Sequence, residues 1–274
     1  MITIQGAKGP RLVLDTTSVF DIGSCWVDGV DIAPGRAIPD DGDRRIDHSL
    51  EGFLFTCGPD HIRHPSVNRN GLRFPLHGSA SGHGAQDVRV ETDDGDLVAR
   101  ATVPLTLVGG HLAELQREWR IKAESGEVVL SDLLINTGPA AFPCFLMYHM
   151  NIGSKHFDAG TRLHGGMLAG GGIPWAFESE DGGLFCVPAD QDAMAEVRLG
   201  PMLALGAKTL RVSFRTDTLP HLQVWHNQRL SARVLGIEPV SHRLADRQAL
   251  ELADEITMLQ PGESRSFGLS FSFE

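Results

Sequence analysis

The chain of 274 residues is poor in positive charge and in aromatic residues. It has 24 lysines and arginines against 35 aspartates and glutamates, so its formal net charge at pH 7 is -11. Nucleic-acid binding needs clustered Lys and Arg, and this balance argues against such a partner. A small neutral or cationic ligand fits the composition better, and we expect no nucleic-acid partner.

The sequence also lacks long hydrophobic runs and paired cysteines. Residues 1–8 contain no charged leader with a following apolar run of signal-peptide length, and no later segment approaches a membrane span. We therefore expect a cytoplasmic protein with no membrane partner. In a reducing compartment, four cysteines without a CxxC motif are expected to be buried thiols. They are Cys25, Cys57, Cys144 and Cys186.

No window holds a helical stripe longer than about three turns, the typical helix length. Only residues 190–196 allow a short helix. By contrast, residues 210–215 and 266–273 alternate apolar and polar side chains with a period of two, as half-buried strands do. Together with 31 glycines and 15 prolines, this pattern predicts an all-β protein with sheets packed face to face, folded as one domain over residues 1–274.

Two hairpins are predicted from alternating segments joined by turn residues. Residues 88–101 turn at an Asp-Asp-Gly-Asp sequence, and residues 115–134 turn at a Ser-Gly pair. A third segment, residues 160–172, is rich in glycine. It is either a lid over a cleft or a connection between sheets, since glycine content reports freedom rather than role.

Three short segments, each with Gly or Pro beside a polar side chain, are far apart in the chain. They are Pro75-Leu76-His77-Gly78, Tyr148-His149-Met150-Asn151-Ile152-Gly153 and Gly236-Ile237-Glu238-Pro239. Because turn residues mark strand ends, we expect each polar side chain to lie where a strand leaves the sheet. Two imidazoles and a carboxylate in such places predict a dispersed acid/base site.

The order and spacing of these segments resemble the aldose 1-epimerase, or galactose mutarotase-like, superfamily. Leu76-His77-Gly78 is similar to the Leu-His-Gly segment of that superfamily. The stretch from residues 118–120 through 135–138 to His149 resembles the strands that lead to its second histidine. Residues 220–225 followed by 236–239 resemble the region that ends at its catalytic glutamate. The resemblance implies a large antiparallel β-sandwich that acts on, or binds, sugars.

The sequence departs from the well-studied galactose mutarotases in two motifs. His149 is followed directly by Met150-Asn151-Ile152-Gly153, and Gly78 is followed by Ser79 rather than by a second glycine. The aspartate that holds sugar hydroxyls in those enzymes has no identified counterpart. The chain looks closer to a bacterial branch of the superfamily whose substrates are poorly defined, so the resemblance supports the chemistry better than the substrate.

Mutarotation needs a base that removes the proton of the anomeric hydroxyl and an acid that protonates the ring oxygen. The resemblance implies these tasks for Glu238 and His149, with His77 donating a hydrogen bond near the ring oxygen. A buried carboxylate and a histidine can exchange protons near neutral pH without a metal or cofactor. We therefore expect no cofactor. The alternative for Glu238 is a structural ion pair with Arg243 or Arg247.

Further residues are expected to bind the substrate. Trp225 offers an apolar face to a sugar ring, or belongs to the core. Arg73, with Arg69 nearby, either reaches hydroxyls or an acidic substituent, or is a solvated turn residue. We also expect Asn151 in this group.

His61 and His64, three residues apart, are expected to face the substrate. With His77 and His83 nearby, they also allow a metal site of the cupin kind. No Glu or Asp stands at the cupin spacing, and the chain is too long for a single small barrel.

The sequence thus predicts an isomerase that interconverts the anomers of a monosaccharide or sugar derivative. Two alternatives stay open: a carbohydrate-binding or sensing protein without turnover, and a metal-dependent sugar isomerase or lyase. A homodimer is compatible with the sequence, which does not identify the sugar.

Overall fold

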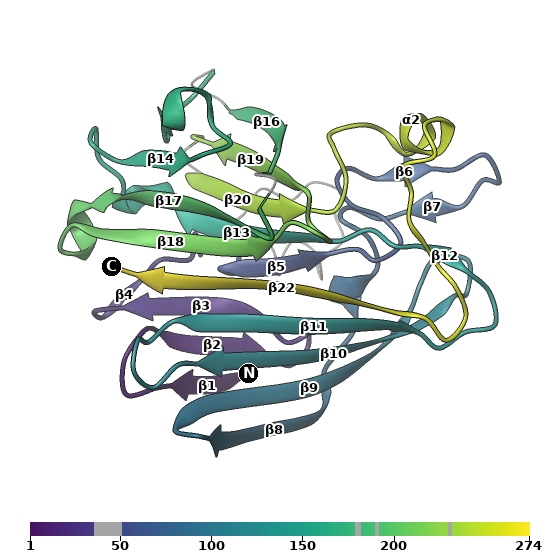
Figure 1. Ribbon diagram of the computed structural model, residues 1–274, viewed down its shortest axis with the longest axis horizontal. Helices are drawn as coiled ribbons and strands as arrows, with labels where there is room; N and C mark the ends of the chain where they lie inside the picture. Colours follow the sequence, from purple (N-terminus) through teal and green to yellow (C-terminus); the bar gives the residue numbers. More distant parts are fainter. Residues whose placement is uncertain (36–50, 179–181, 190–191, 230–231) are drawn as a thin grey trace.

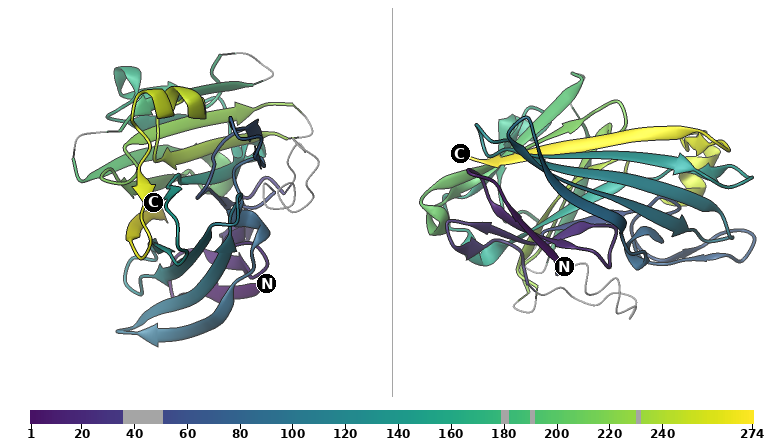
Figure 2. Two further views of the ribbon diagram at one scale, coloured as in Figure 1. Left: turned by 90° about the vertical axis from the view of Figure 1, so that its right-hand side faces the viewer. Right: turned by 90° about the horizontal axis from the view of Figure 1, so that it is seen from below.

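Two large antiparallel sheets dominate the computed structural model, which describes residues 1–35, 51–178, 182–189, 192–229 and 232–274. Each sheet has nine strands (Figure 1). Seen from below, they form two layers, with the purple N-terminal strands in one and the yellow C-terminal strand in the other (Figure 2). The all-β sandwich expected from the sequence is confirmed.

The first sheet has the strand order β1-β2-β3-β5-β13-β20-β19-β16, and β4 pairs with β3. Its strands are β1 (Ile2–Gln5), β2 (Arg11–Asp15), β3 (Asp21–Val27), β4 (Val30–Asp31), β5 (Leu54–Cys57), β13 (Met147–Gly153), β16 (Gly183–Pro188), β19 (His221–Asn227) and β20 (Val234–Val240).

The second sheet has the order β15-β14-β17-β18-β22-β11-β10-β9-β8. Its strands are β8 (Gln86–Asp93), β9 (Asp96–Thr106), β10 (Leu112–Ile121), β11 (Val128–Asn136), β14 (Arg162–Gly165), β15 (Gly172–Pro174), β17 (Met194–Met202), β18 (Lys208–Arg215) and β22 (Ser264–Phe273).

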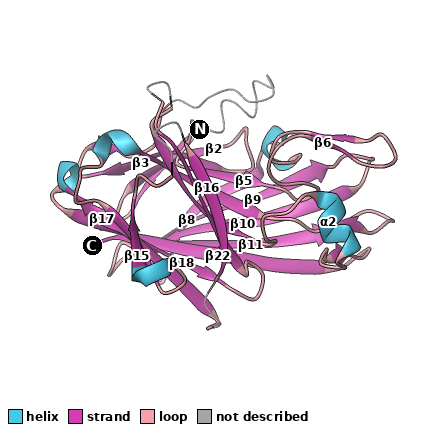
Figure 3. Cartoon of the chain, turned by 90° about the horizontal axis from the view of Figure 1, so that it is seen from above, coloured by secondary structure: helices cyan, strands magenta, loops and turns pink. Residues whose placement is uncertain are grey.

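Helices are few and short, and they lie at the periphery (Figure 3). The described elements outside the two large sheets are the strand pairs β6 (Ser66–Val67) with β7 (Arg73–Phe74) and β12 (Phe142–Pro143) with β21 (Met258–Leu259), the helix α2 (Arg247–Leu252), and the 3-10 turns η1 (Ala80–Gly82), η2 (Ser154–His156), η3 (Ala169–Gly171) and η4 (Leu203–Leu205). No described helix has the length and apolar character to cross a membrane.

The two predicted hairpins are confirmed. β8 and β9 pair from Asp93 opposite Asp96, and the two residues between them, Asp94 and Gly95, both have positive φ (48° and 86°), as a tight hairpin turn requires. β10 pairs with β11 from Ile121 opposite Val128. The alternating segments 210–215 and 266–273 lie in β18 and β22.

The short helix expected over residues 190–196 is wrong in its described part, because β17 begins at Met194. Ala195, Val197 and Leu199 are buried at a spacing of two and face the core. Burial of this alternating side thus determines the structure of the segment. Residues 190–191 lie outside the described residues.

The main hydrophobic core fills the space between the sheets, with residues from both. A smaller cluster packs Phe55, Met147 and Val240 from three strands of the first sheet against Leu250 of α2. These side chains alternate along their strands with side chains of the main core, so they belong to the opposite, outer face of the first sheet. We propose that one domain spans residues 1–274, because both large sheets share the main core.

A buried polar network joins the two sheets inside the core. Arg117 donates through Nε and Nη2 to the two carboxylate oxygens of Asp132 at 2.8 and 2.6 Å, and through Nη1 to Asp21 at 2.5 Å. Thr56 donates to Asp21, and Tyr148 donates to Asp132 at 2.7 Å. We call these five residues the core network. Each charge in it is paired or hydrogen-bonded, as burial demands.

Cys25, Cys57 and Cys144 are buried free thiols, as the sequence predicts. Cys186 is also a free thiol but is half-buried.

Candidate functional site

A cavity of about 290 Å³ opens on the outer face of the first sheet. Its walls come from β13, β16, β19 and β20 and from the loops around residues 63–64, 76–77 and 244. The lining residues are Arg63, His64, Leu76, His77, His149, Asn151, Leu184, Gln223, Trp225, Asn227, Val234, Glu238 and Leu244. The volume is close to the lower end, about 300 Å³, of the range of small-molecule pockets.

Strand register brings His149 and Glu238 together. β13 and β20 are antiparallel neighbours, with Met147 opposite Val240 and Asn151 opposite Gly236, so His149 stands across from Glu238. His149 Nε2 lies 3.0 Å from Glu238 Oε1, and the side chains are only 5% and 0% exposed. Both side chains point to the outer face because their sequence neighbours belong to the core.

Gly236 makes room for the Glu238 carboxylate. The two residues are two positions apart on β20 and therefore share a face. A Cβ at position 236 would overlap Glu238 Oε1 and would lie 3.1 Å from His149 Cε1. Gly236 is thus part of a strand and not of a turn, and the absence of a side chain there is what the site requires.

His77 reaches the cavity from a loop and not from a strand. Its φ of 59° is left-handed. Its N–H donates to the carbonyl of Arg63 at 2.7 Å, and its carbonyl accepts from the N–H of Gly58 at 2.8 Å. The next residue, Gly78, has a φ of 86° and packs so closely on the carbonyl of His61 that a side chain would clash. The loop is therefore held in one shape.

The structure brings His77, His149 and Glu238 to one cavity, but it places two of them differently from the sequence-based expectation. His149 and Glu238 lie inside fully buried strands, and only His77 stands beyond the end of one. The glycines and prolines next to these residues therefore do not mark turns in every case.

The aromatic rings around His149 pack edge to face. The His77 and His149 ring centroids are 5.4 Å apart, and those of His149 and Trp225 are 5.6 Å apart. Trp225 is half-buried and lines the cavity, so it is not a core residue. Two ring nitrogens, Nδ1 of His77 and Nδ1 of His149, are buried and have no hydrogen-bond partner in the described part of the chain.

Burial shifts the pKa values of Glu238 and His77 in opposite directions. Burial raises the pKa of Glu238, although His149, Gln223 and Arg63 act to lower it. Burial, together with the nearby His149, holds the pKa of His77 well below its usual range. His77 is therefore neutral at neutral pH and can donate a hydrogen bond through one nitrogen only.

Neither arginine proposed as an ion-pair partner contacts Glu238. Arg243 binds Glu255 through Nε at 2.7 Å. Arg247 lies over the rings of Phe74 and Phe145 and donates to the carbonyl of Asp60. The described contacts of Glu238 are instead with His149 and Gln223.

The expected substrate-binding residues divide into two groups. His64, Asn151 and Trp225 line the cavity, whereas Arg73 is exposed on β7 and does not. His61 does not line it either: its Nε2 bonds the carbonyl of His64 at 2.6 Å.

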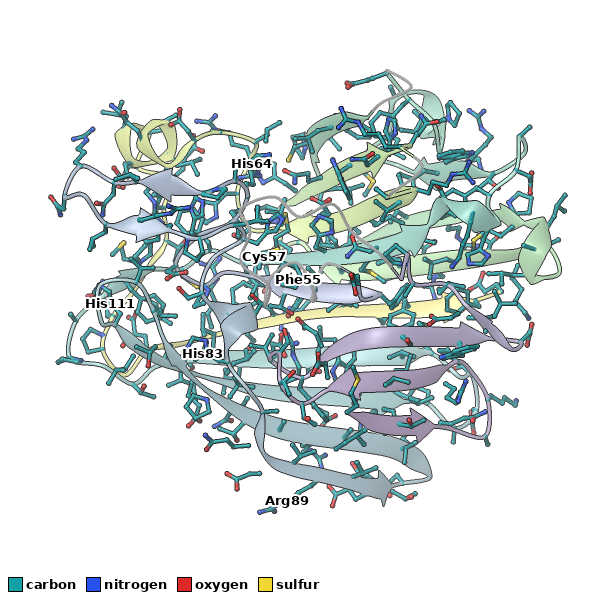
Figure 4. The ribbon with its side chains drawn as sticks, turned by 180° about the vertical axis from the view of Figure 1, so that it is seen from behind. Phe55, Cys57, His64, His83, Arg89 and His111 are labelled. Atoms are coloured by element: carbon teal, nitrogen blue, oxygen red, sulfur yellow. The ribbon has the colours of Figure 1, made fainter. Side chains whose placement is uncertain are left out.

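Among the described residues, the histidines considered as a metal site do not form a ligand set. Seen from behind, His64 lies above Phe55 and Cys57 of β5, and His83 and His111 lie apart from it (Figure 4). His83 Nδ1 bonds the carbonyl of Ser79, and its Nε2 accepts from the N–H of Thr106. Within the described ranges, no three His, Cys, Asp or Glu side chains are grouped as a metal ligand set would be.

The glycine-rich segment 160–172 does not border the cavity. It contains β14, η3 and the start of β15, which form an edge of the second sheet. None of its residues is among those lining the cavity. Of its two predicted roles, a lid has no support here.

A larger depression of about 930 Å³ lies on the second sheet. Several of its charged residues are paired with one another, such as Arg100 with Glu118 at 2.7 Å and Arg117 with Asp132 at 2.6 Å. The smaller cavity differs because it holds buried titratable groups with free atoms, which is the usual mark of an acid/base site.

Three polar lining residues were not identified from the sequence: Arg63, Gln223 and Asn227. Gln223 and Asn227 alternate with core residues on the same strand as Trp225, so the period of two would have placed them on its face. Arg63 has no such signal, since it lies in a loop and has a φ of 75°.

Several solved structures have a similar fold. The "putative aldose 1-epimerase" of Klebsiella pneumoniae is 21% identical, with a TM-score of 0.79 over 99% of this chain and 78% of that one. The Slr1438 protein of Synechocystis is 16% identical, with a TM-score of 0.73 over 100% and 95% of the two chains. A "galactose mutarotase-like protein" of Clostridium acetobutylicum is 12% identical, with a TM-score of 0.69 over 99% and 94%.

A search of curated proteins finds no match to the sequence. The sequence does match one family, described as "Domain of unknown function (DUF4432)", over residues 8–167 and 178–273. This match covers most of the chain, and the structural similarity at these low identities establishes the fold. The protein therefore belongs to the DUF4432 family and has the galactose mutarotase-like fold.

Proposed function

We propose that the protein is an aldose 1-epimerase that interconverts the anomers of a monosaccharide or a sugar derivative. The observation that carries this proposal is the 3.0 Å approach of Glu238 Oε1 and His149 Nε2 at the base of a cavity of about 290 Å³. The names of the structural neighbours support a sugar as the substrate.

Glu238 is the proposed base and His149 the proposed acid. The anomeric hydroxyl and the ring oxygen are bound to the same carbon, so two proton-transfer groups about 3 Å apart can reach both at once. Glu238 removes the hydroxyl proton while His149 protonates the ring oxygen, and the ring opens to the aldehyde. Rotation about the C1–C2 bond and the reverse transfers close the ring as the other anomer.

His77 is proposed to stabilise charge at the ring oxygen. Its pKa is held well below the usual range, so it stays neutral beside His149 and does not repel a protonated imidazole. A neutral ring donates one hydrogen bond, which strengthens as negative charge develops on an oxygen in a site shielded from water. His77 lines the cavity, and its buried Nδ1 has no partner among the described residues.

The remaining lining residues fit a sugar by their chemical types. Trp225 offers an aromatic face for the C–H groups of the ring. Asn151 and Asn227 carry amide groups that can bind hydroxyls, since each amide both donates and accepts. Leu184, which stands directly across from Trp225 on the neighbouring strand, and Leu244 add apolar surface to the cavity.

The experiment is a screen of neutral, acidic and phosphorylated monosaccharides. Binding is measured by the rise in melting temperature, and turnover by NMR exchange between anomers in the same samples. A sugar that both stabilises the protein and shows faster anomer exchange supports the proposal. Stabilisation by a sugar whose anomers exchange no faster than in buffer supports the carbohydrate-binding alternative.

The metal-dependent alternative is tested in the same assay. We expect the exchange rate to survive exhaustive chelation, because proton transfer among Glu238, His149 and the sugar needs no Lewis acid. Loss of the rate on chelation with recovery on adding one metal would favour the alternative.

A further inference from the structure

Arg63 contacts two separate parts of the candidate site. Its backbone carbonyl accepts the N–H of His77 at 2.7 Å. Its guanidinium donates through Nε to Gln223 Oε1 at 2.9 Å and through Nη2 to the carbonyl of His242 at 3.0 Å. The side chain is therefore fixed at both ends of its planar fork. Arg63 thus holds the loop that carries His77 and the strand that carries Gln223.

The contact with Arg63 decides which way the Gln223 amide faces. An arginine Nε–H can only donate, so Gln223 turns its oxygen to Arg63 and its nitrogen to the other side. That nitrogen donates to Glu238 Oε2. A donor at Oε2 favours the ionised carboxylate, because a protonated Oε2 would direct its hydrogen at another hydrogen. The other oxygen, Oε1, faces His149 and accepts no hydrogen bond from the described residues.

We propose that Arg63 is a positioning residue that acts on Glu238 through Gln223. By fixing the amide, it keeps Glu238 ionised with Oε1 as the proton-accepting oxygen, and by its carbonyl it holds His77 in place. This inference rests on the proposed function, since it takes Glu238 as the base. This role requires no contact between Arg63 and the sugar, because Arg63 acts on Glu238 through the Gln223 amide.

Other titratable groups also face Glu238 and have to be considered. His149 faces it from β13, Cys57 from β5 and Cys186 from β16. Burial raises the pKa of both thiols, so they stay neutral at neutral pH. His77 is neutral for the reason given above. The charges that act on Glu238 near neutral pH therefore belong to Arg63 and to His149 when it is protonated.

Removing Arg63 frees the amide to turn. In Arg63→Met, the Gln223 oxygen can face Glu238, where it accepts a hydrogen bond from the protonated carboxyl group. We expect the pKa of Glu238 to rise. Because the base must be deprotonated, the acid limb of the rate profile then moves to higher pH. We expect kcat to fall by up to about 100-fold, as small misplacements of catalytic groups do, with KM nearly unchanged.

The test is a double-mutant cycle with Arg63→Met and Gln223→Met, singly and together. The pKa of Glu238 is followed by ¹³C NMR of the carboxyl groups in glutamate-labelled protein, with the signal assigned by Glu238→Gln. Both single variants should raise this pKa, and the second substitution should add little to the first. Arg198→Met, which removes an exposed guanidinium on β17, is the matched control and should leave the signal unchanged.

Additive shifts in the cycle would overturn the proposal, because they would mean that Arg63 acts by its charge alone. If Arg63→Met does not fold, Arg63→Ala takes its place in the same cycle, since it also removes the donor to Gln223 Oε1. Additive shifts with Gln223→Met would again overturn the proposal, and coupled shifts would support it.

The carboxyl titration and the turnover assay together separate this inference from the proposed function. The carboxyl titration needs no substrate, so it tests the orientation of Glu238 even if the wild-type protein turns over none of the sugars. If the wild-type protein turns over a sugar but the pKa shifts of the two variants are additive, the role of Arg63 is defeated and the proposed epimerase function is not. Coupled pKa shifts in a protein that turns over none of the sugars would support the positioning role of Arg63 and defeat the proposed epimerase function.

Discussion

Tyr148 and His149 are neighbours in β13, and their side chains enter two buried polar clusters of opposite character. Tyr148 joins the core network between the sheets, where Arg117 is bonded to both aspartates. His149 joins Glu238 on the outer face, where buried nitrogen and oxygen atoms are left without a hydrogen bond in the described structure. One strand thus separates a satisfied cluster from an unsatisfied one.

The buried polar groups of the core network stabilise the fold, whereas those around His149 and Glu238 are suited to chemistry. A paired and hydrogen-bonded charge is costly to disturb, but it has no free atom for a ligand. Unpaired buried atoms cost stability, and they are retained where a ligand or a proton will use them. Substitutions in the two clusters should therefore separate loss of activity from loss of stability.

The largest effect is expected on activity, from Glu238→Gln. The amide is nearly isosteric and can still accept from Gln223, but it cannot take a proton from the anomeric hydroxyl. We expect anomer exchange on a sugar that the parent converts to fall about 10²- to 10⁴-fold. Polarimetry or NMR exchange measures the rate, and circular dichroism monitors folding. Wild-type rates in this variant would defeat the assignment of the base.

The next effect is expected on stability, from Arg117→Met. This change leaves Asp21 and Asp132 buried without their partner, which typically costs about 3–5 kcal/mol in the free energy of unfolding. Urea titration measures the cost. Arg100→Met on β9, where the arginine is 39% exposed and paired at the surface, should cost at most about 1 kcal/mol. Equal losses in the two variants would contradict the comparison.

A smaller effect on activity is expected from Gly236→Ala. The added methyl group overlaps the Glu238 carboxylate, so the carboxylate must move away from His149. We expect kcat to fall by up to about 100-fold with little change in the urea midpoint. Gly23→Ala on β3, where the nearest atom to a new Cβ is 3.6 Å away, is the control. A full rate in Gly236→Ala would show that the carboxylate position is not critical.

The smallest effect concerns the pH dependence of stability. Two aspartates share one arginine in the core network, and burial raises the pKa of Asp21 from 3.8 to about 6. Between these values the folded chain binds more protons than the unfolded chain. This contribution to the free energy of unfolding is therefore complete below pH 3.8 and decreases as the pH rises through about 6.

Urea midpoints from pH 4 to pH 7 measure this dependence, with Asp21→Asn as the reference. The difference between the two proteins should change across that interval. Parallel curves would mean that Asp21 keeps the same pKa in the folded and unfolded chains.

Much of the fold could be predicted because its signals are local. Alternation identified β18 and β22, and the Asp94-Gly95 turn predicted the β8–β9 hairpin. The segment at residues 192–196 was misjudged, because a short polar-apolar mixture fits a helix or a strand until burial of one face is known.

The candidate site could be predicted only in part. The motif order identified His77, His149 and Glu238, and the structure gathers them in one cavity. The contribution of Arg63 could not be predicted, since it depends on a loop whose shape comes from contacts with residues far away in the sequence. The place of Arg73 could not be predicted either, since it is near His77 in the sequence but is exposed and does not line the cavity.

The sequence by itself determined local properties of this protein: the strands with clear alternation, such as β18 and β22, the tight turn at Asp94-Gly95, and the polar residues that stand out from apolar surroundings. Only the tertiary structure decided which face of each strand is outer and which side chains meet. His149 and Glu238 are 3.0 Å apart because the register of β13 and β20 sets them opposite each other. That register is chosen by burial of the whole inner face, since a shift by one residue would turn every core side chain outward.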